Sequence, residues 1–231
     1  MQNSKEFRAK PISVVIPTLN EEGNIANVIS GIGKVLRNYK YEIIVVDGHS
    51  KDKTVMIAKR LGARVIYDNL GKGSALVRGL NKAGGDVLIS MDADMSNEPK
   101  ELIALITNIE KGYDMCAGSR FMKGGGSEDI PFIRKIGNKF FVHLVNAIFR
   151  AQFTDMCYGY RSFSRTAFGK LRLKEKGFGI ETEINIQAVK AGLKIKEIPS
   201  FEKKRESGQG KLRTFRDGYV IFRTIVKNIG G

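Results

Sequence analysis

The sequence predicts an α/β fold with a mostly parallel central sheet flanked by helices. Short apolar runs alternate with helical stretches through the first half of the chain, and several of these runs end in polar turns. Unbroken apolar runs of this length are typical of strands that are covered on both faces. We therefore expect strands at residues 12–16, 42–46, 64–67 and 87–91.

Helical stretches separate the predicted strands and complete a βαβαβαβ order, which requires right-handed crossovers. Pro99 suits the first turn of the last of these helices, with Ser96 or Asn97 as its cap. The predicted helices cover residues 22–36, 53–61, 74–82 and 98–109.

The second half of the chain has a different organisation. Its two longest helical stretches, residues 130–150 and 215–228, combine large apolar side chains with Lys and Arg. This composition is typical of basic amphipathic helices, which can lie in a membrane interface or pack on a sheet. A further helix is predicted at residues 180–190, and strands are predicted at residues 160–164 and 195–198.

Length and composition indicate one ordinary globular domain. The chain has 231 residues, of which 42% are hydrophobic and 27% are charged. Cys116 and Cys157 form neither a disulfide framework nor a zinc site, so we expect reduced thiols and a reducing compartment. No stretch reaches the length of a transmembrane helix, and the polar residues 1–10 do not resemble a signal peptide.

The formal net charge of +15 favours a polyanionic partner: nucleic acid, an anionic membrane or phosphorylated substrates. A surface that is basic only for solubility remains an alternative. Nucleic acid is the weakest candidate, because the basic residues are not interleaved with aromatic residues as in known RNA or DNA modules. We therefore expect no nucleic-acid partner.

Polar residues follow three of the predicted strands, at residues 17–21, 47–50 and 92–94. The carboxyl ends of parallel strands meet at one edge of a sheet, where ligands bind in open α/β folds. Asp92 and Asp94, with the small Ala93 between them, suit a hard divalent cation such as Mg²⁺ or Mn²⁺. The alternative is an acidic strand end that serves only as a cap or turn.

Two familiar nucleotide-binding motifs are absent. The first predicted strand is not followed by G-x-G-x-x-G, and the chain has no G-x-x-x-x-G-K-[ST]. Residues 71–74 (GKGS) precede a helix, and their amides could face an anion. An ordinary glycine turn explains the same residues equally well.

Several segments resemble the family 2 glycosyltransferases with the GT-A (Rossmann-like) fold. The general resemblance rests on ISVVIPTLNE (12–21), IIVVDGHS (43–50), SMDAD (90–94) and GSR (118–120). The branch of dolichyl-phosphate mannose synthase and other polyprenyl-phosphate glycosyltransferases is indicated by Asp155, GYR (159–161), GFGIETE (177–183) and FEKKRESGQGK (201–211). The resemblance implies a GT-A catalytic domain over residues 1–200. Residues 201–231 would add a basic loop and amphipathic helix to the same domain, as a possible membrane-surface element.

The resemblance implies an inverting, metal-dependent transfer of one sugar from GDP-mannose or a UDP-sugar to a polyprenyl (dolichyl) phosphate. The enzyme would lie on the cytoplasmic face of the membrane, with Mg²⁺ or Mn²⁺ as cofactor and an anionic membrane surface as partner. A phosphate acceptor, whose second pKa is about 6, needs no general base. The alternative acceptor, a glycan hydroxyl, would need a carboxylate base such as Glu181 or Glu183.

The resemblance also implies roles for individual residues. The metal would be held by Asp92, Asp94 and Ser96, and the acceptor phosphate by Arg120 and Arg134. Asp92, Asp94 and Arg120 would be the catalytic residues. The nucleotide sugar would be bound by Pro17, Leu19, Glu21, Val45, Asp47, Asp92, Ala93, Asp94, Arg205 and Lys211.

Two departures from the family pattern leave the nucleobase and the sugar open. Many relatives have a second acidic residue after the position of Asp47, where this chain has Gly48 and His49. Dolichyl-phosphate mannose synthases often carry Gln at the position of Ser96. Away from these positions, we expect Asp155 and Arg161 to pair as a brace for the site. The oligomeric state is not indicated.

Overall fold

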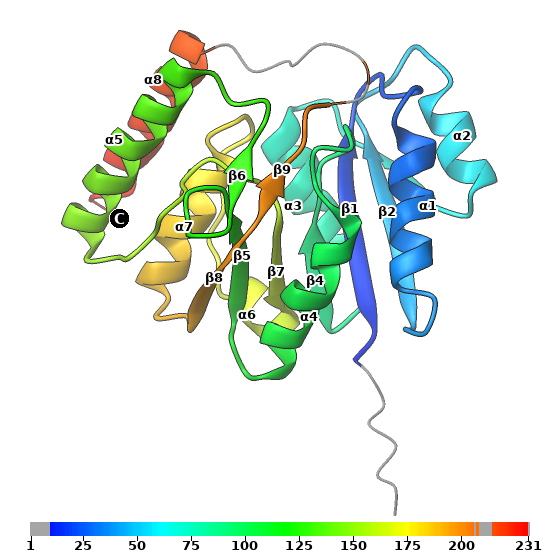
Figure 1. Ribbon diagram of the computed structural model, residues 1–231, viewed down its shortest axis with the longest axis horizontal. Coiled ribbons are helices and arrows are strands. Elements are labelled where there is room, and N and C mark those ends of the chain that lie inside the picture. Colours follow the sequence, from blue (N-terminus) through cyan, green and yellow to red (C-terminus); the bar gives the residue numbers. More distant parts are fainter. Residues whose placement is uncertain (1–9, 206, 208–213, 231) are drawn as a thin grey trace, which may run out of the picture.

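The computed structural model describes residues 10–205, 207 and 214–230 of the chain. A seven-stranded sheet with the order β3-β2-β1-β4-β7-β5-β8 lies at its centre, with helices on both faces (Figure 1). The predicted α/β fold with a mostly parallel sheet is therefore confirmed. Only β7 runs antiparallel to its neighbours in this sheet, β4 and β5.

The first half of the chain follows the predicted alternation of strands and helices, with parallel pairing of β1 to β2 and β4 and of β2 to β3. Its elements are β1 (Ile12–Thr18), α1 (Ile25–Val35), β2 (Tyr41–Asp47), α2 (Thr54–Arg60), β3 (Arg64–Tyr67), α3 (Lys72–Lys82), β4 (Val87–Ser90), the 3₁₀ turn η1 (Pro99–Glu101) and α4 (Leu102–Glu110).

The second half adds the remaining strands of the sheet and a two-stranded ribbon formed by β6 and β9. The sequence did not predict β5, because its residues MCAGS are mostly small and lack the β-branched side chains that mark a strand. The elements are β5 (Met115–Ser119), β6 (Gly126–Ser127), α5 (Phe132–Phe149), β7 (Arg161–Ser164), α6 (Arg165–Phe168), α7 (Ile180–Lys190), β8 (Ile195–Pro199), β9 (Phe201–Glu202) and α8 (Thr214–Lys227).

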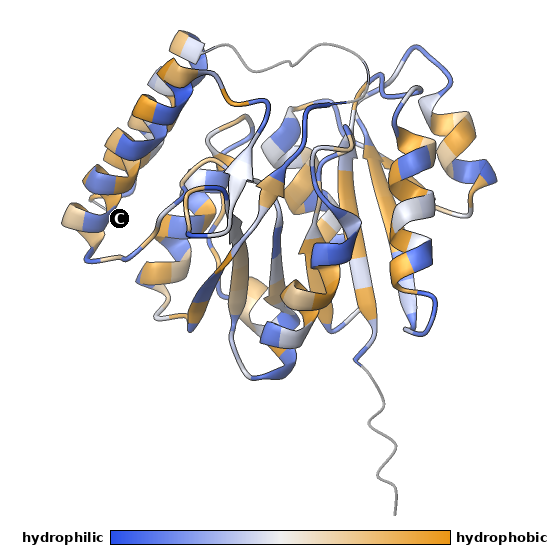
Figure 2. Cartoon of the chain, in the orientation of Figure 1, coloured by the Kyte–Doolittle hydropathy of each residue, from blue (hydrophilic) through white to orange (hydrophobic). Residues whose placement is uncertain are grey.

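Two apolar layers hold the helices to the sheet. One layer joins α1, α2 and α4 to one face of the sheet, and the other joins α3 and α5–α8 to the opposite face. The central strands are apolar along their length (Figure 2), and Val14, Val15 and Ile44 are fully buried. Each such side chain contributes about 1.5–3 kcal/mol. The strands are therefore fixed firmly, and so are the loops that leave their ends.

The predicted cap of the helix after β4 is wrong. The helical segment begins at Pro99 as expected, but Glu98 occupies the cap position and makes no side-chain cap bond. Asn97 is used elsewhere: its side chain accepts the amide of Asp92 at 2.8 Å and donates to the Tyr158 hydroxyl at 2.9 Å. Asn97 therefore supports the Asp92 loop instead of the helix.

Helix α8 packs against α5 and α7, so the C-terminal residues join the body of the domain (Figure 1). The division into residues 1–200 and 201–231 stays a prediction. Among the described residues, no helix has both the length and the apolar character needed to cross a bilayer.

Candidate active site

The structure brings the three polar strand ends to one edge of the sheet. Thr18 at the end of β1 pairs in register with Asp47 at the end of β2, and Gly48 donates its amide to the Thr18 carbonyl at 2.8 Å. Beyond β4, the Met91 amide bonds to the Val15 carbonyl of β1. The loops after β1, β2 and β4 consequently form one surface.

The loops after β1 and β2 are tied together by side chains. Asn20 donates its amide to the Ser50 hydroxyl, and Glu21 donates its amide to the Thr54 hydroxyl, each at 2.8 Å. The fully buried Asp47 accepts the amide of Ser50 at 2.9 Å and its hydroxyl at 2.5 Å. A carboxylate has about four acceptor positions, so Asp47 retains capacity for a ligand donor.

The other residues predicted for the base and ribose occupy different depths. Glu21 is buried and accepts the Asn24 side-chain amide at 2.7 Å. Leu19 is exposed at the edge, and Pro17 is half-buried within β1. Val45 is fully buried in the layer beneath α1 and α2. The structure thus brings Pro17, Leu19 and Glu21 together at the carboxyl end of β1, with Val45 in the core layer.

Asp92 is half-buried and lies in a network of charged side chains. Its Oδ1 is 2.8 Å from the ammonium of Lys72, which is also 2.9 Å from Oε1 of Glu181. Gly159 packs so closely that an added Cβ would lie 3.2 Å from Asp92 Oδ2. Burial raises the pKa of Asp92, and repulsion from Asp94 and Glu181 adds to this rise, while Lys72 opposes it.

Asp94 has a contrasting environment two residues further along. Its Oδ1 accepts the Ser96 amide at 3.1 Å, and its Oδ2 accepts a guanidinium N–H of Arg205 at 2.6 Å. Burial by itself would raise the pKa of Asp94, but hydrogen bonds from Ser96 and the charge of Arg205 outweigh it, so the pKa is lowered. Asp94 is therefore held as a carboxylate.

The oxygen atoms of Asp92, Asp94 and Ser96 suit a hard cation. The two carboxylates are close enough for the charge of Asp94 to raise the pKa of Asp92, and a divalent cation would relieve that repulsion. No cluster of three or more His, Cys, Asp or Glu side chains is found in the described part of the chain. Mg²⁺ commonly needs only one or two carboxylates, because substrate phosphates and water complete its shell.

Arg120 follows β5 and is fully engaged by two carboxylates. Its Nε and Nη2 donate to Asp155 at 2.7 and 2.9 Å, and its Nη1 donates to Glu202 at 3.1 Å. The ring of Tyr158 lies 4.8 Å from the guanidinium. Burial alone would lower the pKa of Arg120, but the charges of Asp155 and Glu202 raise it above its ordinary value.

The predicted pair of Asp155 and Arg161 is wrong, because Asp155 is the partner of Arg120. Arg161 is fully buried on β7, where its guanidinium donates to the carbonyls of Tyr158 and Glu181 and to the Asn185 side chain. Both arginines still support the site, but through different partners.

A hollow of about 270 Å³ lies beside Arg120. Its wall includes cationic and hydroxyl groups as well as large apolar side chains. Lining residues include Arg120, Ser127, Phe132, Lys135, Ile136 and Lys139. The predicted acceptor residue Arg134 does not line it; its Nε instead donates to the Thr214 hydroxyl of α8 at 3.1 Å. Arg120 and Arg134 are therefore not brought together at this hollow.

Two other site residues need mention. The sequence reasoning missed the side chain of Lys72: it considered only the amides of residues 71–74, and the Gly73 and Ser74 amides bond to the Lys176 carbonyl. The missed signal was a Lys at the first position of a helix, where the helix dipole disfavours a cation. Lys211, predicted to bind the donor, lies outside the described residues.

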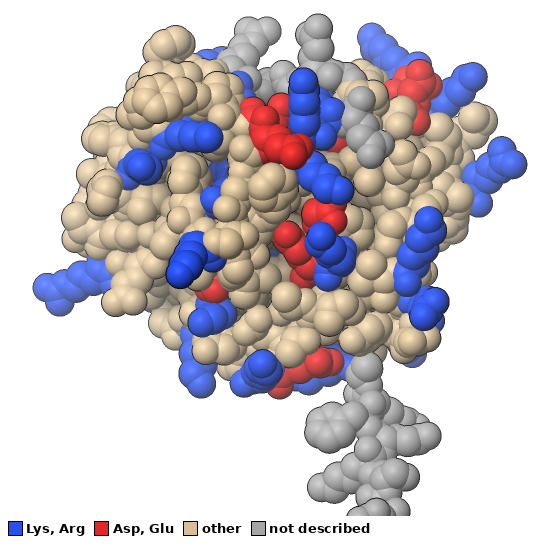
Figure 3. Space-filling model, viewed as in Figure 1, with Lys and Arg blue, Asp and Glu red and all other residues tan. Residues whose placement is uncertain are grey.

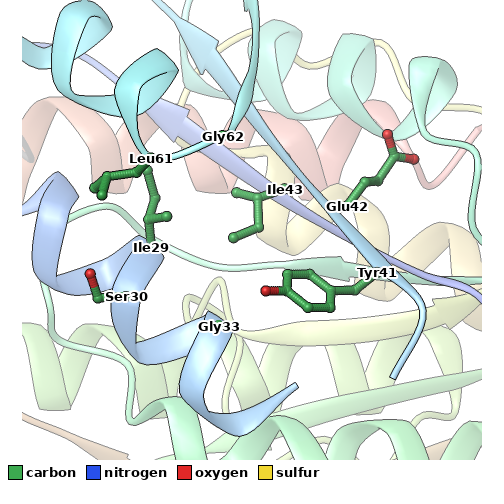
Figure 4. Close-up of a pocket in the computed structure, with 8 residues that line it drawn as sticks. All are labelled: Ile29, Ser30, Gly33, Tyr41, Glu42, Ile43, Leu61 and Gly62. Carbon is green, nitrogen blue, oxygen red and sulfur yellow. The ribbon is translucent and has the colours of Figure 1, made fainter. Parts of the chain in front are cut away.

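A second hollow, of about 380 Å³, lies at the opposite edge of the sheet. Ile29 and Ser30 of α1 face Tyr41 and Ile43 of β2 across it (Figure 4). Tyr41 begins β2 whereas Asp47 ends it, which separates the two places by about 20 Å at 3.3 Å per residue. This hollow is therefore separate from the polar edge.

The comparison with protein families identifies the chain. A model of the family described as "Glycosyl transferase family 2" matches residues 13–172. This chain belongs to glycosyl transferase family 2. The protein is thus a glycosyltransferase, and the resemblance noted in its sequence is confirmed.

Curated relatives agree with the predicted branch. A dolichol-phosphate mannosyltransferase from Pyrococcus furiosus is 35% identical over 91% of this chain, which spans only 60% of that relative. A dolichyl-phosphate hexose transferase from Haloferax volcanii is 30% identical over 96% of this chain and 95% of its own length. A polyprenol monophosphomannose synthase from Mycolicibacterium smegmatis is 28% identical, covering 86% of this chain and 80% of the relative.

A solved structure shares the fold. Glucosyl-3-phosphoglycerate synthase from Mycobacterium tuberculosis, crystallised with Mn²⁺, UDP and phosphoglyceric acid, superposes with a TM-score of 0.76. The match covers 96% of this chain and 79% of the other, at 22% identity. The predicted GT-A fold is confirmed by this likeness.

Proposed function

We propose that this glycosyltransferase moves one hexose, with inversion, from a nucleotide sugar to a polyprenyl (dolichyl-type) phosphate in a metal-dependent reaction. The observation that carries the proposal is the pair Asp92 and Asp94 at the carboxyl edge. Asp92 is paired with Lys72, and Asp94 is paired with Arg205. The named activities of the relatives from Pyrococcus and Haloferax support the same class of acceptor.

Asp92, Asp94 and Ser96 would hold Mg²⁺ or Mn²⁺ together with the donor diphosphate. When bound, the ion stabilises the negative charge that develops on the departing nucleoside diphosphate. Lys72 and Arg205 now neutralise the two carboxylates, and they can turn part of their charge toward the diphosphate once the metal takes over that role. Lys211 is proposed for the same task.

The base and ribose would lie on the loops after β1 and β2. Pro17, Leu19 and Glu21 border this region, and Asp47 offers its remaining acceptor positions to a ribose hydroxyl or a base N–H. Val45 contributes from below by fixing the end of β2. Guanosine and uridine both present such donors, so GDP and UDP both suit these loops.

The acceptor phosphate would be bound at the hollow beside Arg120. Lys135 and Lys139 supply further positive charge there, and the apolar side chains of Phe132 and Ile136 suit an isoprenoid chain. The bonds to Asp155 hold Arg120 in place. Nη1, which donates to Glu202, is therefore the guanidinium nitrogen that would donate to the acceptor phosphate. Arg134, which does not line the hollow, would act outside it, next to Thr214 of α8.

The alternative acceptor is a glycan hydroxyl, which would require a carboxylate base. Glu183 is poorly suited, because its Oε2 accepts the amides of Lys174 and Glu175 at 2.9 and 2.8 Å. Glu181 is paired with Lys72 and faces the site. Of these two candidates, Glu181 is therefore the base that this alternative would use.

The proposed location is the cytoplasmic face of an anionic membrane, with peripheral attachment through α5 and α8. Phe132 and Phe215 are 76% and 86% exposed, which is unusual for phenylalanine. On the face drawn in Figure 3, the surface over α5 is mainly uncharged and is interrupted by basic side chains. Basic residues of these two helices include Lys135, Lys139, Arg216, Arg223 and Lys227.

The test is transfer of radiolabelled sugar from GDP-mannose and from UDP-hexoses, with Mn²⁺ or with EDTA, to polyprenyl phosphate or to a free glycan. We expect a lipid-linked product that needs both the metal and the phosphate group of the acceptor. Transfer to the glycan but not to polyprenyl phosphate would overturn the proposed acceptor, and then Glu181→Gln should abolish activity.

A further inference from the structure

We infer that Glu175 is a positioning residue for Lys72, and that helix α8 supports the donor site through it. The inference rests on the proposed donor role of Lys72. Lys72 needs such support because it is the first residue of α3 and the first turn of this helix contains no acidic residue. The helix dipole disfavours a cation there.

The first turn of α3 is fixed by the backbone of residues 175–177. The Gly73 and Ser74 amides donate to the Lys176 carbonyl at 2.8 and 3.2 Å. The approach is close: a Cβ on Gly71 would lie 2.5 Å from the Lys176 carbonyl oxygen, and one on Gly73 would lie 2.5 Å from that of Glu175. Movement of this turn would therefore move Lys72.

Glu175 holds the backbone of residues 176 and 177. Its Oε1 accepts the amides of Lys176 and Gly177, both at 3.2 Å. The preceding amides, of Lys174 and Glu175 itself, are held by Glu183. Glu175 therefore connects the backbone of residues 176 and 177 to helix α8.

Helix α8 contacts Glu175 through two side chains. The Thr224 hydroxyl lies 3.1 Å from Glu175 Oε2, and it shares its proton with the Val220 carbonyl at 2.8 Å. Arg223 lies 3.8 Å from the same oxygen of Glu175. A Cβ on Gly179 would meet the Thr224 hydroxyl at 2.5 Å, so α8 and residues 175–179 are in direct contact.

The same helix is also fastened to α7, whose first turn carries Glu181, the second partner of Lys72. Asn228 directly follows α8. Its side-chain oxygen accepts the side-chain amide of Gln187 at 2.7 Å, and its backbone carbonyl accepts Lys190 Nζ at 3.0 Å. Both the helix that carries Lys72 and the helix that carries its partner are thus supported by α8. The helix proposed to lie on the membrane is consequently also part of the donor site's support.

The first experiment uses hydrogen exchange in the ligand-free full chain. In Glu175→Ala we expect the Gly73 and Ser74 amides to exchange at least about tenfold faster. Glu175→Gln should restore most of the protection, because its amide oxygen can still accept. Thr224→Val should give a smaller change in the same direction. Glu110→Ala, at an exposed carboxylate ending α4, is the matched control and should leave these amides unchanged.

The second experiment measures binding of GDP and UDP, each with MnCl₂, by calorimetry. Glu175→Ala should weaken binding of the preferred nucleotide about tenfold, but it should have no further effect in a Lys72→Met background. Unchanged exchange at Gly73 and Ser74 in Glu175→Ala, or additive losses in the double variant, would overturn the inference. Faster exchange together with normal nucleotide binding by Lys72→Met supports the positioning and overturns the donor role of Lys72.

Discussion

The carboxyl edge of the sheet and the surface of α5 and α8 depart from the usual placement of side chains in opposite ways: the edge encloses charged residues, and the helices expose apolar ones. At the edge, charged residues such as Asp47, Asp92 and Glu181 are buried or enclosed. On the helices, Phe132 and Phe215 are exposed. Buried charges and exposed apolar patches are the informative exceptions in a folded protein. One region suits a charged ligand and the other an apolar surface, as the proposed reaction between a nucleotide sugar and a lipid phosphate would require.

The largest effect is expected at the charged edge. Asp94→Asn keeps the size of the side chain but removes the negative charge proposed to hold the metal, which in turn would hold the diphosphate, so transfer should fall by at least about a hundredfold. Asp92→Asn should also be severe. The measurement is the initial rate of sugar transfer at saturating donor, with circular dichroism as a check of folding.

Asp86→Asn serves as the control, because this exposed aspartate lies just before β4, at the other end of the strand from Asp92. It should retain the normal rate. Near-normal turnover in a folded Asp94→Asn protein would remove Asp94 from the metal site and leave the comparison without its charged half.

Removal of Lys72 should also destabilise the edge in the absence of ligand. Lys72→Met leaves Asp92 and Glu181 enclosed without their shared cation, and we expect a loss of about 2–3 kcal/mol in the free energy of unfolding. Urea denaturation measures this loss. Lys100→Met is the control, since Lys100 makes an exposed ion pair with Glu98 at 3.4 Å that is worth at most about 1 kcal/mol. Equal losses in the two variants would contradict the proposed network.

The apolar surface predicts a different response to salt. Attraction of vesicles by charge alone should vanish at about 1 M salt, where the Debye length is about 3 Å, whereas inserted side chains leave a salt-resistant fraction. Phe140→Ser and Phe222→Ser, at exposed positions, should each weaken salt-resistant binding to anionic vesicles about fivefold, or about 1 kcal/mol. Flotation at low and high salt measures this binding.

Phe141→Ser sharpens the same test, because Phe141 packs against the core layer beneath α5 and not on the exposed face. It should lower the melting temperature, whereas the other two serine variants should not. Absence of flotation even at low salt would contradict membrane attachment and favour a soluble glycan acceptor.

The smallest effect is expected where the loops after β1 and β2 join. Asp52 accepts the amides of Thr54 at 3.0 Å and Glu22 at 3.1 Å. Burial opposes the change, but the Thr54 bonds and the Glu22 amide together lower the pKa of Asp52 below 3.8. The stabilisation is therefore complete above about pH 4, and it is lost as the pH falls through the lowered pKa.

Asp52→Ala should cost about 1 kcal/mol at pH 7, as is usual for loss of side-chain hydrogen bonds. The difference from the unmodified chain should shrink in denaturation experiments at pH 3 and below. A difference that grows as the pH falls would show that the carboxylate does not stabilise these loops.

The sequence was sufficient to predict the first half of the fold and the location of the polar edge. Apolar runs ending in polar residues locate strands such as β1 and β2 directly. Strand β5 was missed because its small residues carry no periodic signal, and its place depends on pairing with β7 and β8. The partner of Asp155 was also missed, because Arg120 and Arg161 are equally plausible until the sheet brings one of them within reach. Lys72 illustrates the same limit, since its two carboxylate partners lie on β4's loop and on α7.

The most direct test of the central claim is calorimetric titration of GDP-mannose and UDP-hexoses into the unmodified chain and Asp94→Asn, each with Mn²⁺ and with EDTA. The account predicts that one nucleotide sugar binds the unmodified chain in the presence of Mn²⁺, and that EDTA or Asp94→Asn weakens this binding at least about tenfold. Binding of the same affinity in all four conditions would contradict a metal site at Asp92 and Asp94.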